Sequence, residues 1–253
     1  MSVRLSALVL AALVPAFGQS AGQDERRVVS RDGRVEFRLY NAPPNESGYL
    51  FRLAYEVRVG GKLVIDRSYL GIDLLNIEPL LGEKDGLIGT RTADGPGYHS
   101  LVAEYMQDGS LGDRIDIEVR VYDDGVAFRY MLPRSTPLVD LNISNEATEF
   151  RFAAGKEALG ALGEQSAQSP PFIAELPGGQ TVAVLEVRAP DFPAMSLARL
   201  DAGALVTRLA RKKNDSEVAY SGHTPFVGPW RVILFGKDRA RLLDAAWLKD
   251  LRP

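Results

Sequence analysis

Two neighbouring acids, Asp123 and Asp124, are the first residues in this sequence whose types could support chemistry. They stand in VYDDGVAFRY, between two short apolar stretches. Glycoside hydrolysis needs two carboxyl groups that face one bond, roughly 5–9.5 Å apart. Adjacent strand residues point to opposite faces of a sheet, and acids beside a glycine are typical of a turn. The pair therefore predicts the corner of a hairpin rather than an active site.

The register of this hairpin can be predicted from its apolar residues. If Asp124-Gly125 forms a two-residue turn, Val121 lies opposite Phe128, and the apolar residues before and after the turn share one face. Asp-Gly is a favoured dipeptide for a type I′ turn. A slip by one residue would place the two apolar sets on opposite faces.

Other catalytic residue types are scarce. The sequence has two histidines, His99 and His223, and no cysteine. Disulfides, thiolate metal sites and a cysteine nucleophile are therefore excluded, as is a metal site built from several imidazoles. Both histidines lie in expected loops. The motifs of serine hydrolases, P-loop proteins, zinc proteases and EF-hands are absent as well.

Aromatic side chains are the remaining candidates, because exposed rings can stack on sugars. The alternative is that most of them fill the core of a β protein. The sequence alone does not separate these roles, and no carbohydrate-binding residue is assigned. The candidate rings are Tyr49, Tyr69, Tyr98, Tyr105, Trp230 and Trp247.

The first residues have the form of a secretory signal peptide. Arg4 precedes an apolar run at 5–14, and small residues near Gly18 suit cleavage. We expect a leader over residues 1–18, with a boundary as late as 21, and a periplasmic or secreted bacterial protein. The alternatives are an uncleaved anchor or a buried helix. After cleavage, the remaining residues 19–253 are expected to form a single domain without membrane insertion.

The charge of the chain argues against nucleic acid as a partner. The formal net charge is −3, and the sequence pI is about 5.6. The densest basic patch, at 211–213, is short and stands among polar residues that predict a loop. A nucleic-acid-binding domain would need a longer basic stripe.

Most of the remaining sequence alternates apolar and polar residues with period two, which predicts half-buried strands. Gly60-Gly61 predicts a primed turn between two of them. The end of the chain differs, because Leu243, Trp247 and Leu251 recur every four residues and predict a short amphipathic helix. The sequence thus predicts an all-β, two-sheet sandwich with a short C-terminal helix. The expected strands lie within 33–41, 49–71, 116–132, 181–189, 203–212 and 230–236.

Four segments in order resemble the N-terminal domain of glycoside hydrolase family 97: VYDDGVAFRYMLP, ISNEATEFRF, VAVLEVRAPDFPAMSL and TPFVGPWRVILFG. The resemblance runs from about residue 27 to the end of the sequence. It implies a β-supersandwich similar to the galactose mutarotase fold. Family members are secreted bacterial enzymes that act on α-glucosides or α-galactosides. Their catalytic carboxylates lie in a following (β/α)8 barrel, so the resemblance assigns no catalytic residue here.

One functional residue follows from the resemblance. The family binds calcium through glutamates from both domains, and the one given by the N-terminal domain matches Glu186 in VLEVRAPDFPAM. The family has Glu-Ala at this point, whereas this chain has Glu186-Val187. Calcium needs six to eight oxygen ligands. We therefore expect calcium only if a partner barrel completes the site, and otherwise no cofactor; the alternative is that Glu186 is an orphaned surface acid.

Three functions remain open. The first is a secreted, carbohydrate-associated module that is not catalytic on its own. The alternative is one half of a split or truncated glycoside hydrolase, acting on α-glucosides or α-galactosides with a separately encoded (β/α)8 barrel. The third is a mutarotase-like epimerase that uses His99 or His223 with Glu186 as acid and base.

Overall fold

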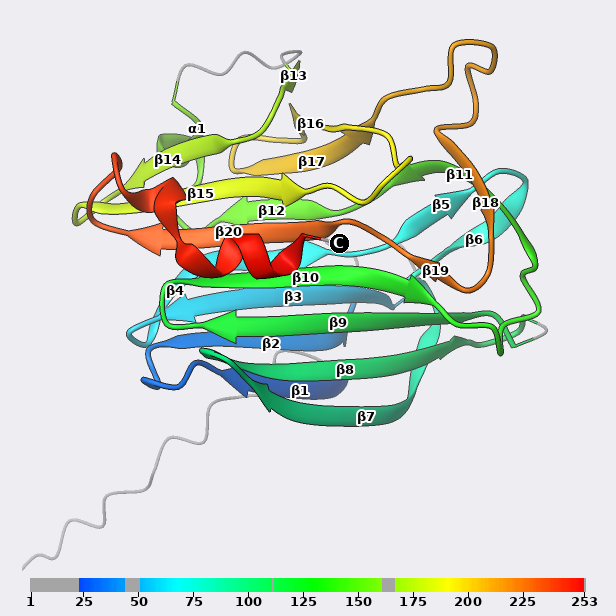
Figure 1. Cartoon of the computed structure of the whole chain (residues 1–253), viewed down its shortest axis with the longest axis horizontal. Coiled ribbons are helices and arrows are strands. Elements are labelled where there is room, and N and C mark those ends of the chain that lie inside the picture. The colour runs from blue at the N-terminus through cyan, green and yellow to red at the C-terminus, as the bar shows by residue number, and fades with distance from the viewer. Residues whose placement is uncertain (1–22, 44–50, 111, 161–166, 253) are drawn as a thin grey trace, which may run out of the picture.

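The computed structural model describes residues 23–43, 51–110, 112–160 and 167–252. The predicted leader at 1–18 lies outside the described residues, as does Tyr49. Within them, two eight-stranded antiparallel sheets pack face to face, and a four-stranded sheet lies at one end (Figure 1). The prediction of an all-β sandwich is confirmed. The described part contains no helix long and apolar enough to cross a membrane.

The first sheet has the strand order β1-β2-β3-β4-β12-β17-β16-β13. It begins as a meander, in which β2, β3 and β4 pair in sequence order, and then takes strands from the middle of the chain. Its strands are β1 (Gln23–Val29), β2 (Val35–Ala42), β3 (Arg52–Val59), β4 (Lys62–Tyr69), β12 (Glu149–Phe152), β13 (Ala167–Gln168), β16 (Met195–Arg199) and β17 (Ala204–Leu209).

The second sheet has the order β14-β15-β20-β10-β9-β8-β7, and β19 pairs with β10. Strands β15 and β20, far apart in the chain, are direct neighbours here. Its strands are β7 (Asp85–Gly95), β8 (Tyr98–Gln107), β9 (Arg114–Tyr122), β10 (Gly125–Leu132), β14 (Phe172–Leu176), β15 (Gln180–Val187), β19 (Phe226–Val227) and β20 (Trp230–Gly236).

The small sheet has the order β18-β11-β5-β6 and lies at the right-hand end of the sandwich in Figure 1. Its strands are β5 (Ile72–Leu74), β6 (Ile77–Leu81), β11 (Asp140–Glu146) and β18 (Tyr220–His223). One short helix, α1 (Lys156–Leu159), follows β12.

Aromatic rings fill the centre of the space between the large sheets. Phe37 stacks on Tyr55 at a centroid distance of 5.2 Å, and Phe128 lies 5.1 Å from Tyr55. All three side chains are fully buried. They occupy the inward positions of the period-two pattern, which explains why that pattern predicted the strands correctly.

Two predicted hairpins are present, one of them with a different turn. Gly60 and Gly61 both have positive φ and join β3 to β4, as expected for a type I′ turn. In the second hairpin, Tyr122 pairs with Gly125, so the turn residues are Asp123 and Asp124. Neither aspartate has positive φ, and the type I′ turn predicted at 124–125 is wrong.

The register of that hairpin shifts by two residues relative to the prediction, with Val121 opposite Val126 and Val119 opposite Phe128. A shift of two preserves the side-chain faces, so the predicted shared apolar face is correct. Gly125 is the first residue of β10. It is a glycine because its neighbours leave no room for a side chain. A Cβ atom there would lie 2.7 Å from Trp247 Cζ2 and 2.9 Å from the Ile233 carbonyl oxygen.

This close approach predicts that Gly125→Ala lowers the free energy of unfolding by about 1–3 kcal/mol through overpacking. Gly86→Ala is the matched control, because a Cβ atom at Gly86, also in a strand, meets nothing closer than 4.0 Å. Urea unfolding of both variants measures the difference. Equal stabilities would contradict the packing argument.

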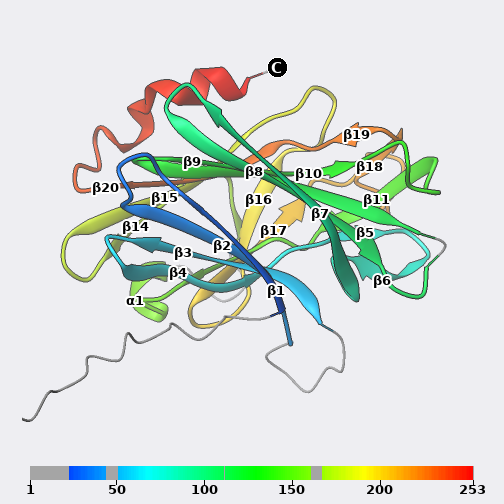
Figure 2. The same ribbon diagram turned by 90° about the horizontal axis from the view of Figure 1, so that it is seen from below.

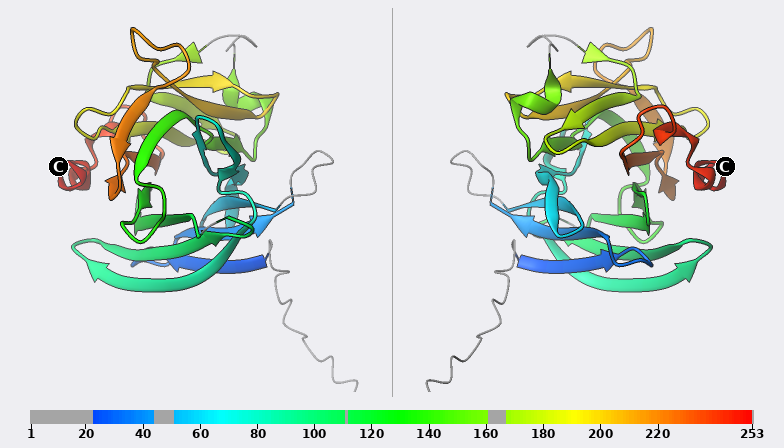
Figure 3. Two further views of the ribbon diagram at one scale, coloured as in Figure 1. Left: turned by 90° about the vertical axis from the view of Figure 1, so that its right-hand side faces the viewer. Right: turned by 90° about the vertical axis from the view of Figure 1, so that its left-hand side faces the viewer.

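The C-terminal helix is present as two 3₁₀ segments, η1 (Leu242–Asp244) and η2 (Ala246–Leu251), on the outer face of the second sheet (Figures 2 and 3). The predicted stripe at every fourth residue is wrong in part, because Leu243 is 38% exposed. A 3₁₀ helix has three residues per turn. The aliphatic side chains that pack on the sheet accordingly recur every third residue: Leu242, Ala245, Leu248 and Leu251. Trp247, from the predicted stripe, packs on the sheet as well.

Candidate functional site

Glu186 and Arg231 form a cross-strand pair near one end of the second sheet. Glu186 lies on β15, directly opposite Arg231 on β20. In WRVILFG, Trp230, Val232 and Leu234 point outward, under the C-terminal segment. Arg231 therefore points inward, where alternation places an apolar residue. A charged side chain at this position needs carboxylate partners inside the protein.

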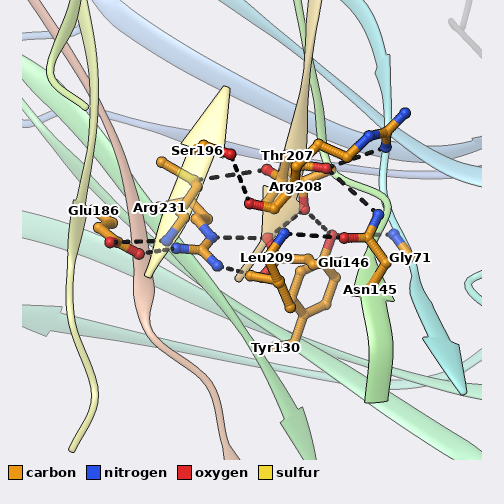
Figure 4. Close-up of polar contacts among 12 residues, drawn as sticks. Gly71, Tyr130, Asn145, Glu146, Glu186, Ser196, Thr207, Arg208, Leu209 and Arg231 are labelled. Atoms are coloured by element: carbon orange, nitrogen blue, oxygen red, sulfur yellow. Dashed lines mark hydrogen bonds and ion pairs between the residues drawn. The ribbon is translucent and has the colours of Figure 1, made fainter. Parts of the chain in front are cut away.

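Arg231 finds two such partners and is 0% exposed. Its Nε donates a hydrogen bond to Glu146 Oε1 at 2.7 Å, and its Nη2 donates to Glu146 Oε2. Its Nη1 donates to Glu186 Oε2 at 2.8 Å (Figure 4). Burial acts to lower the pKa of the guanidinium, but the ion pairs with Glu146 and Glu186 outweigh it and raise the pKa of Arg231. The arginine is therefore permanently charged.

The hydrogen bonds continue inward from Glu146. Thr148 Oγ1 donates to Glu146 Oε1 at 2.6 Å. Because the threonine proton is used there, the 2.6 Å contact between Tyr130 and Thr148 is a donation from the tyrosine hydroxyl. The Gly71 N–H donates to the same tyrosine oxygen at 3.0 Å. We call the connected set the Arg231 network: Gly71, Tyr130, Thr148, Glu146, Arg231, Glu186 and the Met195 N–H.

Glu186 is the end of the network that faces the surface. Its side chain is 8% exposed, and Met195 N donates to its Oε1 at 3.1 Å. Both oxygens are therefore fixed in position. The carboxylate borders a surface hollow of about 470 Å³, which we call the Glu186 hollow. The hollow is also lined by Ser169, Pro170, Pro171, Arg188, Met195, Leu243, Leu248 and Arg252.

The residues present do not form a calcium site by themselves. Glu186 already accepts hydrogen bonds from Arg231 and Met195, and the arginines Arg188 and Arg252 line the hollow. Among the described residues, no group of three or more Asp, Glu or His side chains is placed to hold a metal ion. Calcium needs six to eight oxygen ligands, and the described residues around Glu186 do not supply them.

The histidines are not close partners of Glu186. The loops predicted for both histidines are wrong, because His99 lies on β8 and His223 lies on β18. His99 Nδ1 lies 2.9 Å from the Val29 carbonyl oxygen. His223 Nδ1 lies 2.9 Å from Asp140 Oδ1, in an exposed pair on the small sheet. The acid–base set of an epimerase is therefore not assembled from these three residues.

The two turn aspartates have structural partners. Asp123 Oδ1 accepts the backbone N–H of Asp32 at 3.0 Å. Asp124 Oδ1 accepts Trp247 Nε1 at 2.7 Å, so it holds the C-terminal segment against the sheet. Both border a shallow hollow, together with Trp247. These hydrogen bonds give both aspartates a structural role, Asp123 in a contact with the Asp32 backbone and Asp124 in fixing the C-terminal segment.

Of the five candidate aromatic rings that the structure describes, three are buried. Tyr69, Tyr105 and Trp230 are at most 5% exposed. Tyr98 and Trp247 are half-buried and pack on Tyr122, with Trp247 parallel to the Tyr122 ring at 3.8 Å. The core alternative thus holds for Tyr105, which belongs to the main core, whereas Tyr69 lies in a separate small cluster. Trp230, Tyr98 and Trp247 belong to the packing of the C-terminal segment on the outer face of the second sheet.

Sequence reasoning found Glu186 but missed the residues that fix it. Arg231 and Glu146 are 85 positions apart, so no local motif links them. One signal was available: arginine stands at an inward position of the strand WRVILFG. Such a residue indicates a buried ion pair before its partners are known.

Fold and site together define an antiparallel β-sandwich domain that holds one acid at its rim through a buried arginine. A family model described as "Glycosyl-hydrolase 97 N-terminal" matches residues 28–169, more than half of the chain. The chain belongs to this family, and the resemblance seen in the sequence is confirmed.

Several similar solved structures have the same fold. A glycoside hydrolase family 97 enzyme from Pseudoalteromonas sp. strain K8, in complex with acarbose, matches with a TM-score of 0.75 and 19% identity, over 90% of this chain and 38% of that chain. The same values hold for a variant of that enzyme in complex with panose.

A β-arabinopyranosidase matches with a TM-score of 0.66 and 19% identity, over 85% of this chain and 40% of that chain. This chain therefore spans about two fifths of the enzymes that share its fold. No curated protein matches its sequence.

Proposed function

We propose that this protein is a secreted, carbohydrate-associated module that is not catalytic on its own. Two findings support the sugar part of the proposal: membership of the glycosyl-hydrolase 97 N-terminal family, and a fold shared with enzymes whose structures hold acarbose and panose. The leader predicted over residues 1–18 supports a periplasmic or secreted location.

The observation that carries the proposal is the fixed carboxylate of Glu186 at the surface hollow. A carboxylate has about four lone-pair sites, and Arg231 and Met195 occupy two of them. The remaining sites can accept hydroxyl groups. Arg188 and Arg252 add donors to the same hollow, and Leu243 and Leu248 give it an apolar wall. Convergent polar groups on an apolar wall suit a sugar ring.

Titration calorimetry with panose at millimolar concentration tests this proposal. We expect saturable binding by the purified chain, and a loss of about tenfold or more in affinity for Glu186→Gln, because each charge-assisted hydrogen bond contributes about 1.5–3 kcal/mol. Glu175→Gln, at a 69% exposed side chain, is the matched control and should bind as the parent does. No binding, or equal binding by Glu186→Gln with an unchanged melting temperature, would contradict the proposal.

A second candidate is favoured by the same carboxylate. In this alternative the Glu186 face docks against a separately encoded (β/α)8 barrel, and the pair acts on α-glucosides or α-galactosides. Calcium enters only here, since the barrel would have to supply the ligands that this chain lacks. The hollow would then lie at the boundary between two domains, a common place for ligand sites.

A further inference from the structure

A second hollow lies beside the C-terminal segment, on the outer face of the second sheet, where β20 begins. Its volume is about 390 Å³, within the range of small-molecule sites. Residues of strands β9, β10 and β20 line it, as do residues at the end of the C-terminal segment. We call it the arginine hollow.

Two arginines on the floor are held rigidly. Arg120 and Arg129 occupy outward positions of neighbouring strands, and their guanidinium carbons lie 4.6 and 4.2 Å from the centre of the Trp230 ring. Glu118 lies between them and accepts hydrogen bonds from both. Cation–π contact and ion pairing together fix the planes of the two guanidinium groups.

Neither guanidinium is used up by these contacts. A guanidinium has five N–H donors, and Glu118 binds Nε and Nη2 of each arginine. The remaining N–H groups can serve another acceptor. Burial acts to lower the pKa of Arg120, but Glu118 outweighs this and raises it, so the charge is permanent.

Two more arginines line this hollow, and both also line the Glu186 hollow. Arg188 and Arg252 are both exposed, and the hydrogen bond from Arg188 Nη2 to the Phe192 carbonyl oxygen is long, at 3.4 Å. Asp250 is the one acid among the lining residues. Four guanidiniums set against Glu118 and Asp250 leave a net charge of +2, that is, 4 − 2.

We propose that the arginine hollow binds the carboxylate of an acidic sugar, such as a uronic acid. Planar guanidinium groups bind a carboxylate through two parallel hydrogen bonds. Val187, Pro229 and Leu251 supply apolar contact for a ring. The sugar part of this ligand rests on the proposed function, whereas the carboxylate part rests on the arginines.

Titration calorimetry of the full chain with glucuronate, glucose and acetate tests this inference. We expect glucuronate to bind more tightly than glucose or acetate. Arg188→Gln should weaken glucuronate binding by about tenfold, the size of one charge-assisted hydrogen bond. Asp250→Asn, which removes the one lining acid, should strengthen it severalfold. Rising salt should weaken it too.

Each contrary outcome identifies what is wrong. If neither Arg188→Gln nor Asp250→Asn changes the affinity for glucuronate, the arginine hollow is not its binding site. Equal affinities for glucuronate and acetate would show a site for simple anions and overturn the sugar part. Failure of panose to bind, with glucuronate still sensitive to both substitutions, would contradict the proposed function and leave the carboxylate site standing.

Discussion

Arg231→Met is expected to lower the free energy of unfolding by about 3–5 kcal/mol, the cost of removing one partner from a buried ion pair. The arginine is 0% exposed and satisfies Glu146, which is only 2% exposed. Without Arg231, the negatively charged carboxylates of Glu146 and Glu186 lie near each other inside the protein with no positive charge to compensate them. Methionine fills much of the volume of the arginine side chain. The lost stability therefore comes from removing the charge and not from leaving a cavity. Urea unfolding measures it directly.

Two comparisons separate the causes. Arg239→Met removes an arginine from an exposed pair with Glu175 and should change stability by at most about 1 kcal/mol. Adding Glu146→Leu to Arg231→Met removes the stranded charge and should restore part of the loss. A double variant as unstable as Arg231→Met alone would contradict the electrostatic explanation.

Asp85→Asn is expected to stabilise the protein above neutral pH. Asp85 is 5% exposed, and its carboxylate oxygens have no hydrogen-bond partner. Burial raises its pKa from 3.8 to about 7, and Glu83 acts in the same direction, while the nearby N–H of Gly82 lowers it in part. The folded protein therefore binds this proton more tightly than the unfolded chain does.

The sign of the effect follows from this linkage. Below pH 3.8, both states carry the proton and the group contributes nothing. Between pH 3.8 and about 7, only the unfolded chain releases it, so stability falls as pH rises. At about 1.4 kcal/mol per pKa unit, the free energy of unfolding above pH 7 is a few kcal/mol lower than it is below pH 3.8.

Thermal or urea unfolding at pH 4 and pH 8 tests the prediction. We expect Asp85→Asn to match the parent at pH 4 and to exceed its stability by roughly 2–4 kcal/mol at pH 8. Asp108→Asn, at an exposed position in a hollow that Asp85 also lines, should show no such change. An advantage that is equal at both pH values would contradict an ionised Asp85.

The strands within the expected ranges, and their faces, were predictable from the sequence, because burial on one face imposes a period of two. Other strands, among them β7, β8 and β11, lie outside those ranges. The turn at Asp123 and Asp124 was not. Its residues look like an Asp-Gly turn, but Gly125 is required by contact with Trp247, which lies more than a hundred residues later. A tertiary contact of this kind can override the local preference of a sequence for one type of turn.

The C-terminal segment shows a second limit. Its apolar residues fit either a spacing of four or a spacing of three, and an isolated pattern favours the α-helix. Packing on the outer face of the second sheet selects the 3₁₀ spacing for the aliphatic side chains, with Leu242 and Leu251 buried. The residues of the candidate site were likewise predictable only in part. Glu186 followed from the family resemblance, whereas Arg231 and Glu146 meet only through folding.

If this sandwich binds sugar without hydrolysing it, calorimetry with panose detects both the binding and the absence of hydrolysis in one experiment. Binding alone gives heats that saturate as the sites fill, whereas turnover gives a heat flow that persists after each injection. We expect saturating heats, reduced in Glu186→Gln, and no persisting heat flow. Sustained heat flow, with glucose accumulating in the cell, would contradict a non-catalytic module, and the absence of any heat would contradict carbohydrate binding.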